Sequence, residues 1–221
     1  MNIGFYGHST CAYRGQDSLV DIVASNLNAT IINTGVRQGS EERILFELKK
    51  SKNLDLAIIF HSEAQYLFLP DSDRDIGMNN IDDARAEYLF TDFSKNNHPK
   101  FVDIFKNEEN FLDVFLNFKN YLYHPDLQMN RFIGALSQID QYLYTRQIPT
   151  IHVVIKKTIP DWFKFKSGIV DNISMDLANK CAVKKGEWFV NCINKEGNLL
   201  IAQRLTGLAE ELFPPSPAAV I

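Results

Sequence analysis

The amino-acid sequence predicts a three-layer α/β/α sandwich with a mostly parallel sheet of about five strands, similar to flavodoxin-like domains. Its first sixty residues alternate short apolar runs with segments whose apolar residues recur at helical spacing. The apolar runs are nearly continuous, which is typical of strands that helices cover on both faces. With 221 residues and no internal repeat or linker, the chain has the length of a single domain.

The N-terminal elements follow one another in a regular order. Strands are expected at residues 2–7, 29–34 and 54–60, and helices are expected to begin at Ser18 and Ser40. Ser18 is expected to cap the first helix, and acidic residues in the first turn of the second helix suit its macrodipole. Strands that alternate with helices in this way indicate a parallel sheet.

The middle and the C-terminal part of the chain are less regular. Residues at about 63–97 form a long excursion rich in Asp and Asn, which is expected to lie over the strand ends as a cap. The remaining elements are expected to be two helices, a buried strand, two short strands and a closing helix, at 101–123, 127–146, 150–155, 168–171, 187–192 and 197–212. We therefore expect one domain over residues 1–213 and a loose, Pro-rich tail at 214–221.

The composition argues against several classes of protein. The formal net charge is −4, whereas a protein that wraps nucleic acid or binds a membrane surface needs positive charge near phosphate. No apolar run is long enough to span a membrane, and the N-terminus lacks the pattern of a secretory signal. Cys11, Cys181 and Cys192 form neither a disulfide framework nor a zinc pair. We expect a cytoplasmic protein with reduced thiols and no metal, cofactor, nucleic-acid or membrane partner.

Polar residues and glycines follow three of the predicted strands. They occupy residues 7–10, 35–40 and 61–62, and ligands bind at the carboxyl ends of the strands in open parallel sheets. A serine hydroxyl at Ser9, with donors at the other two ends, suits acyl transfer, in which backbone N–H groups hold the developing oxyanion. A serine in such a position is more commonly a turn or helix-cap residue.

The same segments carry a resemblance to a known family. The run Gly4-Phe5-Tyr6-Gly7-His8-Ser9 resembles the first block of the SGNH (GDSL) hydrolases, with His8 where that family usually has Asp. Residues 33–40, 54–62 and 191–202 resemble the second, third and last blocks, and the middle of the chain stays unassigned. The resemblance implies that Ser9 is the nucleophile, and that Gly39 or Gly35 and the Ser9 N–H are oxyanion donors.

The departures from the family pattern affect the catalytic base. The last block of the family has the form Asp-x-x-His, and these positions fall on Phe189 and Cys192. A thiol is a poor replacement for imidazole near neutral pH, because its pKa is about 8.5. The asparagine of the third block falls on His61 or Ser62, and His61 is the best substitute for either the base or the oxyanion donor.

Other residues are weaker candidates for this chemistry. His8 adjoins Ser9, but neighbouring side chains near a strand end tend to diverge. His152 lies within a predicted buried strand, where a histidine is more often a satisfied core residue. Cys11 and Cys192 could pair with a histidine as nucleophiles, although a buried, inert thiol is the favoured interpretation of both.

Two functions follow from the sequence. The first is a serine esterase or carbohydrate deacetylase, acting on a small acyl ester or an acetylated carbohydrate, with weak or lost activity. The alternative is a catalytically inactive SGNH-like chain that binds a protein partner or has a structural role, such as an accessory protein of a phage virion. The replacements Phe189 and Cys192 favour the alternative, and Ser9 with its neighbouring glycines favours the enzyme.

Two further motifs have simpler interpretations. The acidic residues of 71–82 follow the spacing of a calcium loop, but Ile76 stands where glycine is needed and Asp82 where glutamate is needed, which favours a solvated loop. Aromatic residues at 162–165 alternate with lysines and could stack on a sugar or a base. An exposed lid or a partly buried loop is the favoured interpretation of this second motif.

Overall fold

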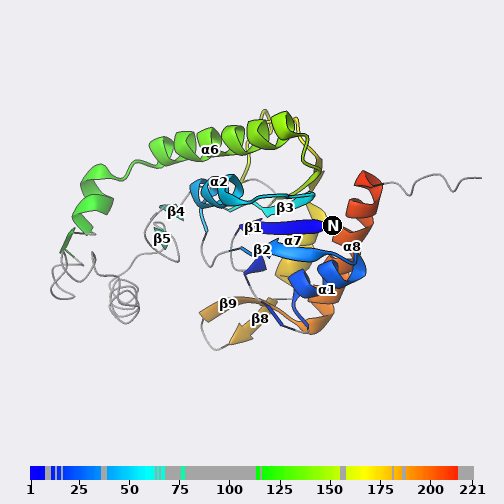
Figure 1. Ribbon diagram of the computed structural model, residues 1–221. Coiled ribbons are helices and arrows are strands. Elements are labelled where there is room, and N and C mark those ends of the chain that lie inside the picture. The colour runs from blue at the N-terminus through cyan, green and yellow to red at the C-terminus, as the bar shows by residue number, and fades with distance from the viewer. Residues whose placement is uncertain are drawn as a thin grey trace, which may run out of the picture.

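A five-stranded, all-parallel sheet forms the centre of the molecule in the computed structural model (Figure 1). Its strand order is β2-β1-β3-β6-β7, which is 2-1-3-4-5 when only the strands of this sheet are counted. This is the flavodoxin-like order, so the predicted fold class is confirmed. The strands are β1 (Asn2–Gly7), β2 (Thr30–Asn33), β3 (Leu56–Phe60), β6 (Thr150–Val153) and β7 (Ile169–Asp171). The structure describes residues 1–7, 11–12, 14–15, 17–35, 39–62, 64, 66–67, 76–77, 113–114, 116–154, 158–180, 182–185 and 188–213.

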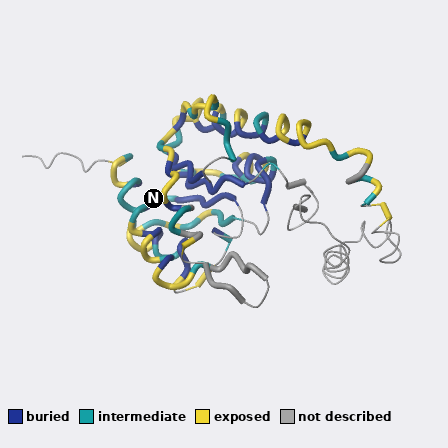
Figure 2. Tube along the Cα trace, turned by 180° about the vertical axis from the view of Figure 1, so that it is seen from behind, coloured by how far each residue is buried: buried dark blue, intermediate teal, exposed yellow. Residues whose placement is uncertain are grey.

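Helices cover both faces of this sheet. One face packs on α1 (Leu19–Asn26) and α8 (Lys195–Leu212), with α7 (Ile173–Lys180) beside α8. The other face packs on α2 (Glu41–Lys50) and α6 (Pro125–Arg146). Figure 1 shows these layers, and Figure 2 shows that burial is concentrated in the central strands and in the helix sides that face them.

Each face of the sheet has its own apolar core, as the alternation of side chains along a strand requires. In β3, Ile58 packs toward α1 and α8, whereas Ile59 packs toward α2 and α6. The first core includes Ile3, Phe5, Val20, Val23, Ile151, Ile201 and Leu205. The second core includes Tyr6, Ile44, Leu48, Ala57, Ile139 and Leu143. The predicted burial of the strands on both faces is present in β1, β3 and β6, whereas the edge strand β2 is only partly covered.

The helix starts follow local sequence signals. Ser18 accepts a hydrogen bond from the Asp21 N–H at 3.2 Å, and Ser40 accepts one from the Arg43 N–H at the same distance. These bonds satisfy backbone donors that a helix N-terminus otherwise leaves unpaired. Pro125 begins α6, where its missing N–H costs no helical hydrogen bond. The sequence had placed the start of this helix two residues later.

Several short elements lie outside the predicted scheme. The strand expected at 187–192 is β9 (Trp188–Ile193), which pairs antiparallel with β8 (Ala182–Lys185) and does not join the central sheet. β4 (Tyr66–Leu67) and β5 (Ile76–Gly77) form a second antiparallel pair, and η2 (Phe118–Leu122) is a π-helical turn. The rest of the expected cap at 63–97, most of the helix at 101–123 and the tail at 214–221 lie outside the described residues.

Helix α7 was missed because its start signal comes from the preceding strand. The sequence predicts no helix between the short strands at 168–171 and 187–192. The Asp171 carboxylate, at the end of β7, accepts hydrogen bonds from the Ile173 and Ser174 N–H groups and so caps the helix. Asp171 also pairs with Arg204 of α8 at 2.7 Å, which ties both helices to the edge of the sheet. Within the described residues, no helix is both long and apolar enough to cross a membrane.

Candidate functional site at the carboxyl edge of the sheet

The candidate site lies where β1 and β3 end, which is the point at which the winding of the sheet reverses. The chain passes from β1 to β2 on one side and then returns to place β3 on the other side of β1. In doubly wound sheets a crevice forms at such a switch point, outside the carboxyl ends of the strands. Gly7 ends β1 opposite Phe60 of β3, so both strands leave the sheet at the same level.

Glycine is required at the end of β1. Gly7 has a φ of +129°, which side chains rarely tolerate, and a Cβ atom there would overlap the carbonyl oxygen of Phe60. The backbone of β1 can therefore approach β3 this closely only because residue 7 has no side chain. This close approach fixes the ends of β1 and β3 against each other at the same edge.

Glu41 joins the start of α2 to the end of β3. Its carboxylate accepts a hydrogen bond from the Ser62 N–H at 2.7 Å, and its other oxygen lies 3.0 Å from His61 Nδ1. Gly39 and Ser40, which lead into α2, are buried at the same junction. Three of the predicted site residues, Gly39, His61 and Ser62, are thus brought together at one edge.

The remaining predicted site residues have different positions. The Gly35 N–H donates to the Cys11 carbonyl at 3.1 Å, so this donor is already used within the protein. Ser9 lies outside the described residues, and Cys192 falls in β9, whose side chains are not described up to that residue. The catalytic roles predicted for Ser9 and Cys192 stay predictions. The Cys11 thiol is fully buried, and burial raises its pKa to about 12, which makes it a poor nucleophile at neutral pH.

His61 belongs to a continuous chain of buried polar side chains. Its Nε2 lies 2.9 Å from His152 Nδ1, and His152 Nε2 lies 3.0 Å from Ser167 Oγ. Ser167 Oγ in turn lies 2.7 Å from Asp140 Oδ1. We call the five residues Glu41, His61, His152, Ser167 and Asp140 the polar chain, and each of them is at most 5% exposed.

The polar chain connects five separate parts of the fold. Glu41 is the first residue of α2, Asp140 lies on the inner face of α6, His61 directly follows β3, and His152 lies in β6. Ser167 lies in the connection between β6 and β7. The Phe165 ring from the same connection stacks on the His152 ring, with 4.0 Å between centroids. The polar chain and this ring fill the space between the sheet and α6 near the candidate site.

The donors and acceptors of the polar chain define where its hydrogens lie. The Asp140 carboxylate accepts from the N–H groups of Lys166 and Ser167, so it acts as an acceptor toward the Ser167 hydroxyl as well. His152 then donates from Nε2 to Ser167 and accepts at Nδ1 from His61. His61 thus donates from Nε2, and one further hydrogen is shared in the contact between its Nδ1 and Glu41. Each of the four links in the chain thus contains one hydrogen.

The electrostatics agree with this arrangement. Burial, and after it the charge of His61, hold the pKa of His152 well below its usual value. A neutral His152 is what the hydrogen arrangement requires, because its Nδ1 must accept. The carboxylates at the two ends are each supplied with donors, which makes their burial tolerable.

Sequence reasoning identified only part of this cluster. His61 was found from its place after a strand, and His152 was expected to be a satisfied core histidine, as its contacts bear out. Glu41 was noted only for the helix macrodipole, and Asp140 and Ser167 were not noted. The available signal for Asp140 was an acidic residue within the apolar stripe of a helix, next to Ile139.

The aromatic motif at 162–165 is divided between surface and interior. Trp162 is 69% exposed, whereas Phe163 and Phe165 are partly buried and pack edge to face on each other. Lys164 and Lys166 are exposed between them. The interpretation as a partly buried loop fits these positions, and Phe165 is the residue that anchors it.

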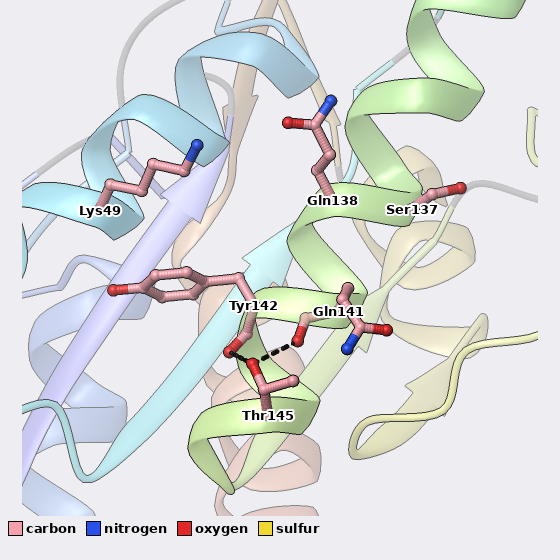
Figure 3. A pocket seen from close by; sticks show the side chains of 6 residues that line it. All are labelled: Lys49, Ser137, Gln138, Gln141, Tyr142 and Thr145. Atoms are coloured by element: carbon pink, nitrogen blue, oxygen red, sulfur yellow. Dashed lines mark hydrogen bonds between the residues drawn. The ribbon is translucent and has the colours of Figure 1, made fainter.

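A groove of about 520 Å³ lies elsewhere, between α2 and α6. Figure 3 shows its lining of Lys49, Ser137, Gln138, Gln141, Tyr142 and Thr145. The Thr145 hydroxyl donates to the backbone carbonyls of Gln141 and Tyr142, as the dashed lines show, so its hydrogen is used within α6. The groove contains none of the predicted site residues, and we assign it no function.

Comparison with models of protein families, with curated protein sequences and with solved structures gives no match to this chain. Within the part of the chain that the structure describes, no group of three or more His, Cys, Asp or Glu side chains could hold a metal ion. The acidic loop at 71–82 lies largely outside that part. The fold and site define an α/β protein with a flavodoxin-like sheet and a polar junction at its switch point.

Proposed function

We propose that this protein is a slow serine ester hydrolase, acting on a small acyl ester or an acetylated carbohydrate at the β1–β3 edge. Ser9 is the proposed nucleophile, and the backbone at Gly39 is the proposed oxyanion donor. The observation that carries the proposal is the Glu41 junction, which holds Gly39, His61 and Ser62 together at the switch point of the sheet. The resemblance of these segments to SGNH hydrolase blocks supports the same chemistry.

Slow turnover follows from the state of the histidine. Both ring nitrogens of His61 have protein partners, Glu41 and His152, and its ring is fully buried. To act as a base or as an oxyanion donor, His61 must first break one of these hydrogen bonds. The positions of the usual carboxylate and imidazole carry Phe189 and Cys192, which supply neither group.

The proposal predicts weak but specific labelling of one serine. A fluorophosphonate probe should label the wild-type protein slowly at Ser9, as located by peptide mass mapping, and the protein should hydrolyse p-nitrophenyl acetate slowly. Ser9→Ala should abolish both signals, because the attacking oxygen is gone. Ser25→Ala is the matched control, since Ser25 is an exposed serine of α1, and this variant should keep both signals.

A gain-of-function variant provides the converse test. Phe189→Asp combined with Cys192→His should raise both labelling and hydrolysis if these positions correspond to the lost carboxylate and base. The gain should stay well below the ~10⁶-fold that a complete triad provides, because a grafted pair is seldom well oriented. Absence of labelling at Ser9 in both proteins would reject the hydrolase.

A binding or structural role is the second candidate, and the same histidine favours it. A His61 held between Glu41 and His152 resembles a satisfied structural residue more than a free base. In this case the edge would contact a protein partner, and both the wild type and the double variant would remain inert toward esters. An accessory role in a virion falls within this second candidate.

A further inference from the structure

The connection between β6 and β7 is an irregular segment beside the polar chain. We call its described residues, 158–168, the strap. Parallel neighbours are usually joined by a helix, whereas the strap is irregular and lies on the side of the sheet that α6 covers. β6, which precedes the strap in the chain, ends beside β3 at the edge that carries the candidate site.

The C-terminal part of the strap is held on the body by the polar chain. Asp140 accepts hydrogen bonds from the N–H groups of Lys166 and Ser167 at 3.0 and 2.9 Å, and from the Ser167 hydroxyl at 2.7 Å. Ser167 also contacts His152 at 3.0 Å. The Phe165 ring lies on the His152 ring and 5.2 Å from the His61 ring centroid. These contacts join the strap to both histidines.

We propose that the polar chain is a proton-controlled latch, which holds the strap on the sheet with one hydrogen per link and releases it when one more proton is added. The four links contain four hydrogens, so the closed chain has no vacant acceptor between its members. The proposal is independent of ester hydrolysis, because it concerns the strap and the buried histidines alone.

An added proton disrupts the chain at its centre. The nitrogen of His152 that is open to protonation is Nδ1, which lies 2.9 Å from the Nε2–H of His61. Two donors would then face each other, and the added charge on His152 would lie in a site without water contact. Moving the strap away exposes His152 to solvent and removes this cost. Protonation therefore favours the open form.

The charges around His152 are compatible with this direction. Glu41 of α2 and Asp140 of α6 are the carboxylates of the chain, and the first is already paired with His61 while the second is occupied by the strap donors. Asp171 of β7 pairs with Arg204 on the opposite face of the sheet. Lys164 and Lys166 of the strap are exposed. None of these described groups faces His152 Nδ1 in place of His61.

The dependence of strap opening on pH has a defined sign and size. In the closed form the pKa of His152 is held well below normal, and in an open form a solvated imidazole has a pKa near ~6.5. Opening is thus insensitive to pH above that value and is favoured as the pH falls below it. For one imidazole, the opening equilibrium should increase about 30-fold between about pH 7.5 and about pH 5.

Hydrogen exchange measured by mass spectrometry tests the latch in the full-length protein. The strap peptide should lose about 30-fold in protection between about pH 7.5 and about pH 5, after correction for intrinsic exchange rates, while a peptide from α8 keeps its protection. Equal protection of the strap at both pH values would overturn the proposal, and so would an equal loss in α8, which would indicate global unfolding.

A pair of variants tests the coupling. His152→Asn removes the titrating ring but keeps a polar side chain between His61 and Ser167, so the strap should lose its pH response. Ser174→Ala is the control, because Ser174 is a buried serine whose hydroxyl has no hydrogen-bond partner among the described residues. The hydrogen-exchange measurements on the wild-type protein at the two pH values still test the proposal if either variant folds poorly. Identical pH responses in both variants would contradict the latch.

Discussion

At the scale of single residues, Glu41 has two structural functions at once. It is the first residue of α2, and its carboxyl group forms a hydrogen bond with His61 Nδ1 and accepts another from the Ser62 N–H. A carboxylate that is 1% exposed is tolerated only with such donors, because an unpaired buried charge is strongly destabilising. The helix start, the end of β3 and the polar chain therefore depend on one side chain.

Replacing Glu41 tests this dependence. Glu41→Ala removes both oxygens and leaves the buried Ser62 N–H and His61 Nδ1 without this partner, so it should lower the free energy of unfolding by roughly 3–5 kcal/mol. Glu42→Ala is the control, because Glu42 is the next residue and makes a partly exposed pair with Arg131 at 3.1 Å. It should cost less than about 1 kcal/mol. Urea unfolding of both variants measures the difference. Equal losses in the free energy of unfolding would show that the hydrogen bonds of Glu41 add no more stability than the surface pair of Glu42.

The residues of the polar chain also show the limit of sequence reasoning at this scale. His61 was identifiable because it directly follows an apolar run, and strand ends are a local feature. Asp140 and Ser167 are 27 positions apart and meet only because α6 and the strap pack on the same face. No local sequence pattern indicates this contact. The only signal for it is one acidic residue within the apolar stripe of a helix.

At the scale of elements, α8 illustrates which part of an amphipathic helix the sequence can predict. The helix was expected from residue 197 and begins at Lys195, with the Asn194 side chain accepting from the Gly197 N–H at 2.7 Å. The apolar spacing of the helix places Leu199 and Leu200 with Leu205 on one face, but each of the first two is 41% exposed, and Ile201 is fully buried instead. The apolar run at 199–202 is wider than one helix face, so packing on α1 and β6 selects its inner side.

This correction yields a pair of variants on one helix. Leu205 is fully buried in the core between α8 and the sheet, so Leu205→Asp should lower the free energy of unfolding by several kcal/mol or prevent folding. Leu199→Asp makes the same chemical change at an exposed position and should cost less than about 1 kcal/mol. Thermal unfolding followed by circular dichroism separates the two, and a similar loss in both would mean that α8 packs differently.

At the scale of the whole molecule, the fold was predictable because its main signal is repeated. Each strand of the central sheet is an apolar run with Gly, Pro or a polar residue beside it, and the helices between the early strands show clear periodicity. The β8–β9 hairpin and α7 were not predictable in the same way. Which strand pairs with which, and which carboxylate caps a short helix, are decided by contacts between distant segments.

The whole sheet also depends on how its two halves meet, at β1 and β3. The β1–β2 pair and the β3–β6–β7 group join there, and Gly7 makes the contact with Phe60 at the site edge. Gly7→Ala would place a methyl group against the Phe60 carbonyl and would require an unfavourable φ for alanine. Separation of the strand ends should follow, because the backbone carbonyl cannot move without disrupting β3.

We expect Gly7→Ala to lower the free energy of unfolding by at least ~1–3 kcal/mol, the cost typical of such backbone strain. Gly134→Ala is the control, because Gly134 lies within α6 with open space around its Cα and should gain about 0.5–1 kcal/mol as alanine. Urea unfolding curves give both changes, and the opposite signs make the comparison insensitive to a general effect of added methyl groups. A neutral Gly7→Ala would mean that β1 and β3 are not in close contact at their ends, and the junction on which the candidate site depends would be lost.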